Sequence, residues 1–173
     1  MSNSSQLPAD GAARQWFAID AVRNLKSRYF RTMDGKDWAG LAMVFAPDAD
    51  FDARCSFSLR AGDDSPAGRL AADWHLFGRE AIVDFIRAGT QAYVTVHHGH
   101  GHEVVLDGPD DAHGVIAMED FIFEQRDGAM RQLLHGMGHY HERYRRIDGC
   151  WYILSSRISR LYVDYTPLPG DPL

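Results

Sequence analysis

Helical periodicity shapes the first half of the chain. Apolar residues recur every three or four positions across residues 14–35, which predicts an amphipathic helix that ends at an Asp-Gly pair. A second helix is predicted over 37–45, because the residue before Pro47 disfavours helical backbone. A third covers 78–89 and ends at a glycine. Residues 1–12 are polar, lack this periodicity and are expected to be flexible.

Strand-like alternation and turn signals replace this pattern in the second half. Before the third helix, residues 56–77 are predicted to form a long hairpin whose loop is the AGDDSPAG segment at 61–68. Asp-Gly turn pairs then separate four predicted strands, which span 93–106, 114–125, 130–147 and 151–165. Three N-terminal helices and a long antiparallel sheet predict an α+β fold with a concave interior, formed by one domain over residues 13–173.

Composition and charge exclude several classes of partner. The chain has 173 residues and a net charge of −6, from 18 basic and 24 acidic residues, and its basic cluster is limited to Arg143, Arg145 and Arg146. Nucleic acid is therefore not an expected partner. No apolar run reaches the roughly 20 residues of a membrane span, and the start lacks a signal-peptide pattern. Because Cys55 and Cys150 are isolated, we expect a cytoplasmic protein with reduced thiols.

Four of the nine histidines stand together at the start of a predicted strand, namely His97, His98, His100 and His102. Strand alternation places the last three on one face and His97 on the other, unless Gly99 introduces a bulge. One interpretation is a zinc or iron site completed by His139 or His141, since neutral imidazole suits these ions. Because neither an HExxH motif nor a facial-triad pattern is present, we expect no metal and no cofactor.

The second interpretation is acid–base chemistry by one inward-facing histidine, His97, with a carboxylate that fixes its tautomer. Asp34 is the natural carboxylate, although Asp-Gly between two helices is also ordinary turn chemistry. At a helix C-terminus it faces the negative end of the helix dipole, which predicts a raised pKa for its carboxyl group. Tyr29 lies on the apolar face of the first helix, where a core role is as compatible with the pattern as a catalytic one.

Further charged residues interrupt the apolar positions of the predicted sheet. Asp120 or Glu119 must point away from water, and a buried carboxylate needs a partner such as His97 or an arginine. Arg157 and Arg160 lie on the last strand, where alternation puts them on opposite faces. An arginine inside a pocket would hold an oxyanion or an anionic group of the substrate. Spacing alone does not choose between the two arginines.

Four stretches together resemble the SnoaL-like branch of the nuclear transport factor 2-like superfamily, within which the bile-acid 7α-dehydratases are the most similar. The stretches are LKSRYFRTMDGKDW (25–38), VHHGHGHEVVLDG (96–108), MEDFIF (118–123) and YRRIDGCWYILSSRISRLY (144–162). The resemblance covers most of the chain from Ile19 to Tyr165. It implies a cone-shaped fold, in which a curved antiparallel sheet packs against the three helices, and assembly as a homo-oligomer, either a dimer or a trimer.

The resemblance also implies a function and assigns roles to particular residues. The catalytic tyrosine, aspartate and histidine of the dehydratases fall on Tyr29, Asp34 and His97, and two further pocket positions fall on Asp120 and Arg160. The implied reaction is a cofactor-independent elimination of water from a small hydrophobic hydroxyketone of steroid, polyketide or aromatic type. An isomerase, a cyclase and a non-catalytic ligand-binding protein on the same scaffold are the alternatives.

The sequence departs from the dehydratase pattern where the substrate is expected to enter. It carries an insertion across about residues 55–75 and has histidines at 98 and 102 where that enzyme has other residues. Arg157 is the fallback for the pocket arginine, because the dehydrochlorinase branch of the superfamily places its arginine nearer to that position. Fold and acid–base groups can therefore carry over while the substrate differs.

Overall fold

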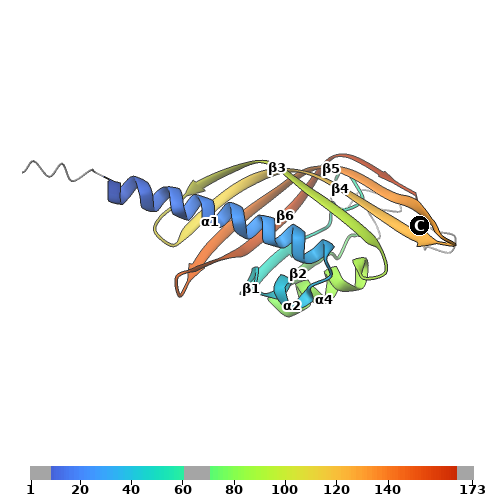
Figure 1. The fold of residues 1–173 in the computed structure, drawn as a ribbon, viewed down its shortest axis with the longest axis horizontal. Coiled ribbons are helices and arrows are strands. Elements are labelled where there is room, and N and C mark those ends of the chain that lie inside the picture. The colour runs from blue at the N-terminus through green and yellow to red at the C-terminus, as the bar shows by residue number, and fades with distance from the viewer. Residues whose placement is uncertain (1–8, 61–70, 167–173) are drawn as a thin grey trace, which may run out of the picture.

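The computed structural model describes residues 9–60 and 71–166, which form helices packed against one side of a curved sheet (Figure 1). The helices are α1 (Ala9–Asp34), α2 (Trp38–Ala42) and α4 (Arg79–Thr90). The strands are β1 (Phe45–Asp52), β2 (His75–Phe77), β3 (Val94–Leu106), β4 (Asp111–Arg126), β5 (Ala129–Ile147) and β6 (Cys150–Tyr165). This arrangement confirms the expected α+β fold with three helices preceding the long strands.

Helix α1 follows the predicted periodicity but begins earlier than expected. Its buried face runs from Val22 to Met33, and the residues between the buried positions are mostly exposed. The helix starts at Ala9, inside the 1–12 segment expected to be flexible, because alanine-rich sequence sustains helix without an apolar repeat. Residues 1–8 lie outside the described residues.

The second helix is shorter than its prediction of 37–45. Asp37 caps α2 by accepting a hydrogen bond from the backbone N–H of Gly40 at 2.9 Å, and the helix ends at Ala42. From Phe45 the chain is already strand β1, so the apolar residues there belong to the sheet. Pro47 falls where the register of β1 against β6 shifts, which is where a strand between two neighbours tolerates proline.

The sheet is mixed, with strand order β2-β1-β6-β5-β4-β3. Strands β3 to β6 form the predicted antiparallel series, and β1 pairs parallel with β6. The Asp127-Gly128 and Asp148-Gly149 turns have positive φ at both residues, as two-residue hairpin turns of type I′ require. Among the strands that the structure describes, only the β1–β6 pairing departs from the antiparallel expectation. The predicted hairpin over 56–77 is described in part, since β2 pairs antiparallel with β1 while residues 61–70 lie outside the described residues.

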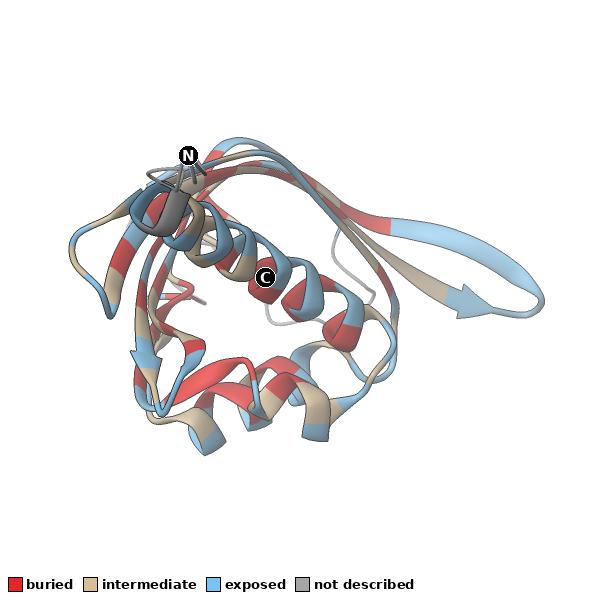
Figure 2. Cartoon of the chain, turned by 60° about the vertical axis from the view of Figure 1, so that its left-hand side comes forward, coloured by how far each residue is buried: buried red, intermediate tan, exposed pale blue. Residues whose placement is uncertain are grey.

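The core lies between the concave side of the sheet and the helices. Figure 2 shows buried residues on the sides of α1 and the sheet that face each other, whereas the tip of the β4–β5 hairpin is exposed. Helix α1 packs against β3 and β6, and α4 packs against β1. Within residues 9–60 and 71–166, no helix combines the length and the apolar character needed to span a membrane.

Candidate active site

A cavity of about 380 Å³ opens between the concave face of the sheet and the helices. Its walls are largely aromatic and aliphatic, with Phe51, Phe57, Trp74 and Phe85 among them. Trp74 packs edge-on against both Phe57 and Phe85, so the three rings form one continuous wall. Phe57 and Trp74 lie within the stretch expected to be an insertion relative to the dehydratases, and both line the cavity.

The polar groups of the cavity come from α1 and from neighbouring strands of the sheet. Tyr29, His97, Asp120 and Arg160 all line it. His97 on β3 stands directly opposite Asp120 on β4, and residues paired in this way share one face of a sheet. Four of the five predicted site residues therefore meet at one cavity. The fifth, Asp34, contacts the side chain of His97.

Asp34 and His97 form a hydrogen-bonded pair between the end of α1 and β3. Nδ1 of His97 lies 2.6 Å from Oδ1 of Asp34, and the backbone N–H of His97 donates to Oδ2 at 2.8 Å. Thr95 donates its hydroxyl to Oδ1 at 2.8 Å. Because an ionised carboxylate only accepts hydrogen bonds, Nδ1 carries a proton, and in the neutral imidazole the lone pair is then on Nε2. His97 lines the cavity, so Nε2 is the ring nitrogen left for a ligand.

The pKa of Asp34 is shifted in the direction opposite to the sequence-based expectation. Burial alone raises the pKa of this carboxyl, but the hydrogen bonds and charge of His97 and the hydroxyl of Thr95 lower it below its ordinary value. The helix dipole is outweighed because three donors converge on one carboxylate. Asp34 is therefore an ionised partner that holds the His97 ring in place.

Asp120 and Arg160 form a second, deeply buried pair. Nη1 and Nη2 of Arg160 donate to the two carboxylate oxygens of Asp120 at 2.5 and 2.8 Å, and Nε donates to the carbonyl of Ser56 at 3.0 Å. Burial opposes the charge on Arg160, but the hydrogen bonds and charge of Asp120 raise its pKa, so the guanidinium stays charged. Gly136 lies beneath both side chains, where a Cβ would collide with them.

The structure decides between the two arginines of β6. Arg160 is 7% exposed and faces the cavity, whereas Arg157 is exposed. Arg160 is not an unpaired anion holder, since Asp120 neutralises it. Asp120 binds Arg160 and, in the described part of the chain, makes no hydrogen bond to His97. Of the two candidate carboxylates, Asp34 is therefore the one that orients the histidine.

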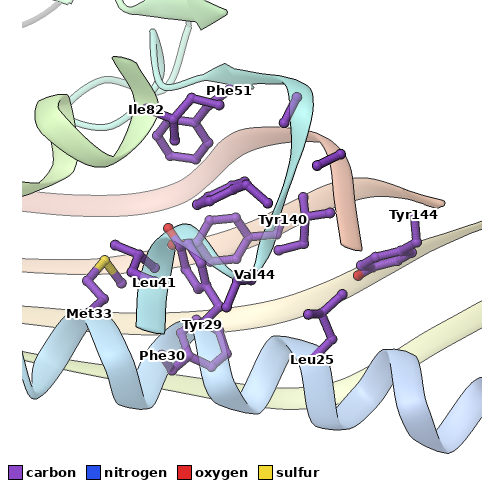
Figure 3. Packing of buried hydrophobic residues seen from close by; sticks show 14 of the residues in the cluster. Leu25, Tyr29, Phe30, Met33, Leu41, Val44, Phe51, Ile82, Tyr140 and Tyr144 are labelled. Carbon is purple, nitrogen blue, oxygen red and sulfur yellow. The ribbon is translucent and has the colours of Figure 1, made fainter. Parts of the chain in front are cut away.

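Tyr29 has a neighbour that the sequence pattern did not single out. Figure 3 shows Tyr29 from α1 beside Tyr140 from β5, with ring centroids 5.9 Å apart and the planes edge to face. Both line the cavity, and their hydroxyls are hydrogen-bonded to each other. Burial raises the pKa of both phenols well above the usual range, so both are neutral. The Tyr140 hydroxyl donates to the Tyr29 oxygen, which leaves the Tyr29 hydroxyl to donate to a ligand. Tyr140 stands at an inward position of β5 between two histidines, which is the signal that could have revealed it.

A buried ion pair lies under these two tyrosines. Lys26 donates to Oε1 of Glu142 at 2.6 Å, and their side chains are 2% and 0% exposed. Ser156 also donates to Oε1, and the Tyr144 hydroxyl donates to Oε2. Sequence reasoning missed both charged residues, although Lys26 interrupts the apolar face of α1 and Glu142 the inward row of β5.

The histidine run divides between the two faces of the sheet in a way that only a bulge explains. His98 and His100 lie on the outer face near Glu119, which also binds His135 at 2.8 Å. A register shift between Gly99 and His102 turns His102 inward, where Nε2 meets the Tyr144 hydroxyl at 3.1 Å.

The expectation that His98, His100 and His102 share a face is therefore wrong. The alternative, a bulge at Gly99 that changes the alternation, is the one observed. In the described part of the chain, no group of three histidine, cysteine, aspartate or glutamate side chains is placed to hold a metal ion. Burial lowers the pKa of His102 to about 4, despite the opposing charge of Glu142.

Comparison with solved structures finds the same fold in proteins of different activities. A putative scytalone dehydratase from Novosphingobium aromaticivorans matches with a TM-score of 0.71 and 14% identity, over 91% of this chain and 93% of its own. A hexachlorocyclohexane dehydrochlorinase of type 3 from Novosphingobium barchaimii matches with a TM-score of 0.66 and 16% identity, over 92% and 96%. A protein of unknown function from Mycobacterium tuberculosis matches with a TM-score of 0.66 and 23% identity, over 96% and 82%.

These similarities establish the fold alone. At sequence identities this low, the activity of a neighbour cannot be assigned to this chain. The sequence itself matches the model of the SnoaL-like domain over residues 15–157, which include the whole of the Asp34–His97 pair and the two cavity tyrosines. That match spans most of the chain, and the fold agrees with it. The chain is a member of the SnoaL-like family.

Proposed function

We propose that this protein is a cofactor-independent dehydratase that eliminates water from a small hydrophobic hydroxyketone. The observation that carries the proposal is the Asp34–His97 pair at the wall of an apolar cavity. Asp34 occupies Nδ1 of the histidine, which leaves the Nε2 lone pair for a proton of the ligand. A base oriented by a carboxylate and facing an apolar cavity suits proton abstraction next to a carbonyl group.

In the proposed reaction, His97 Nε2 removes a proton from the carbon next to the substrate carbonyl, and Asp34 stabilises the resulting imidazolium. Tyr29 donates a hydrogen bond to the carbonyl oxygen as that oxygen gains negative charge. The carbon–carbon double bond forms as the bond to the hydroxyl on the adjacent carbon breaks. The departing hydroxide takes the proton from His97 and leaves as water, so no external acid, base or cofactor is consumed.

The cavity supports a neutral and compact substrate. Its volume of about 380 Å³ lies near the lower end of the roughly 300–1,000 Å³ of ligand pockets. Asp120 already neutralises Arg160, so the pair offers a polar contact without net charge for a hydroxyl or carbonyl group. A substrate carboxylate would have to compete with Asp120 for the same guanidinium. An aromatic, polyketide-like or steroid-like ketone without a carboxylate is therefore favoured.

The test is turnover of a panel of neutral β-hydroxyketones, from single-ring to steroid-sized, by the wild type and by His97→Gln. The readouts are the absorbance of the conjugated enone and the loss of one water in the mass spectrum. We expect the His97→Gln and Asp34→Asn variants to lose about 10²-fold or more in kcat while their circular dichroism spectra are retained. His100→Gln, exposed on the same strand, is the matched control.

Full activity of His97→Gln would refute the proposed mechanism. An isomerase or cyclase on the same site would need the same histidine but would give a product of unchanged mass. If the protein only binds ligands, members of the panel should quench the fluorescence of Trp74, which lines the cavity, and none should be converted.

A homo-oligomer, dimeric or trimeric, and a cytoplasmic location complete the proposal. Exposed apolar side chains on the sheet support association, since Met137, Leu161 and Tyr162 are 39%, 71% and 47% exposed. Sedimentation equilibrium of the wild type and of Tyr162→Glu would test this assembly. A monomer at micromolar concentration would contradict it.

A further inference from the structure

The buried ion pair of Lys26 and Glu142 takes no part in the reaction as drawn, yet it touches both cavity tyrosines. Nζ of Lys26 lies 3.9 Å from the ring centroid of Tyr29 and 3.4 Å from that of Tyr140. These distances are well within the roughly 6 Å over which a cation interacts with the face of an aromatic ring. One ammonium group therefore contacts the rings of two phenols that line the cavity.

We infer that Lys26 is a positioning residue that strengthens Tyr29 as a hydrogen-bond donor to the ligand. An ammonium on the ring face attracts electron density and stabilises negative charge that develops on the phenol oxygen. The effect is large in this place because the groups are buried and water does not screen them. The inference rests on the proposed function for its consequence in turnover, but the electrostatic coupling can be measured without a substrate.

The partners of Glu142 explain how a lysine can stay in the core. Its carboxylate accepts hydrogen bonds from Lys26, Ser156 and Tyr144, so that both oxygens of the buried anion have donors. Burial lowers the pKa of Lys26 to about 8, against the opposing charge and hydrogen bond of Glu142. The ammonium form therefore predominates at neutral pH, which the proposed coupling requires.

The experiment replaces Tyr29 by tetrafluorotyrosine, whose more acidic phenol can be titrated by phenolate absorbance and by fluorine NMR. The phenol pKa is then compared in three charge variants. Lys26→Met leaves the anion alone and should raise this pKa most. Lys26→Met with Glu142→Gln removes both charges and should raise it by about one unit, a tenfold change in the acid constant. Glu142→Gln leaves the cation alone and should lower it.

Tyr144→Phe is the matched control, because it removes a hydrogen bond from the other oxygen of Glu142 and leaves the charges in place. It should leave the phenol pKa of residue 29 unchanged. The double variant keeps the core neutral, so it reports even if Lys26→Met alone fails to fold. An unchanged phenol pKa in the double variant would overturn the inference, as would a shift equal to that of Tyr144→Phe.

The outcome is separable from that of the proposed function. If the phenol pKa moves as expected but no hydroxyketone is converted, the coupling stands and the dehydratase proposal fails. If the wild type converts substrate and the double variant leaves the phenol pKa unmoved, the dehydratase proposal stands and the role of Lys26 fails.

Discussion

Replacement of Arg160 by methionine should destabilise the protein by about 3–5 kcal/mol, because it leaves the carboxylate of Asp120 buried without its partner. The side chains of Arg160 and Asp120 are 2% and 7% exposed, and two hydrogen bonds of 2.5 and 2.8 Å join them. Asp120→Asn should cost a similar amount, since it leaves the guanidinium without its counter-charge. The double variant removes both charges and should cost about 2–3 kcal/mol less than the sum of the single variants.

Urea unfolding measures these differences. With a slope of about 2 kcal/mol per molar, a loss of about 4 kcal/mol lowers the unfolding midpoint by about 2 M. For a chain of this size, the same loss lowers the melting temperature by about 8–16 °C. Arg145→Met is the control, because Arg145 and Asp111 form an exposed pair at 3.3 Å whose side chains are 42% and 51% exposed. Its removal should cost about 0–1 kcal/mol.

If the stability losses of the two single variants at Asp120 and Arg160 add up to the loss of the double variant, the two charges are not coupled. If Arg160→Met lowers the urea midpoint no further than Arg145→Met does, burial of the pair has no energetic consequence. Either result would mean that the core tolerates one unpaired charge there, through water or through rearrangement of the side chain.

Two further predictions concern stability. The pKa of His102 is lowered to about 4 in the folded protein. As the pH drops, His102 is protonated in the unfolded chain before it is protonated in the folded one, so stability falls between about pH 6.5 and about pH 4. His102→Gln should remove this part of the fall in urea midpoint, whereas His100→Gln on the exposed side of the strand should keep it. A Cβ at Gly138 would collide with the carbonyl oxygen of Ser159, while one at Gly101 meets nothing within 4 Å. Gly138→Ala should therefore cost at least about 2 kcal/mol in thermal unfolding and Gly101→Ala less than about 1, and equal losses would contradict the packing argument.

The long strands were predictable because local sequence specifies them. The turns at Asp127-Gly128 and Asp148-Gly149 end alternating runs, and strands β3 to β6 begin and end within three residues of the predicted positions. Strand β1 was not predictable in the same way. Its residues follow a helix directly, and its place beside β6 is a parallel pairing between segments about 100 residues apart, which no local pattern encodes.

The candidate site was predictable as a set of residue types but not as a geometry. His97 and Asp120 share a rung of the sheet, which follows from register, and register depends on pairing across the whole sheet. The inward turn of His102 depends on a bulge that glycine allows and does not require. The lowered pKa of Asp34 depends on donors from β3, which lies 60 residues further along the chain.

The Asp34–His97 contact joins the end of helix α1 to the edge strand of the sheet as well as orienting the histidine ring. Strand β3 is at the end of the sheet, where a backbone N–H has no neighbouring strand to bind, and Asp34 accepts the N–H of His97. A relative that had lost all turnover would still gain stability by keeping the aspartate and the histidine. Loss of the aspartate should therefore loosen the end of α1 from β3 as well as release the histidine ring.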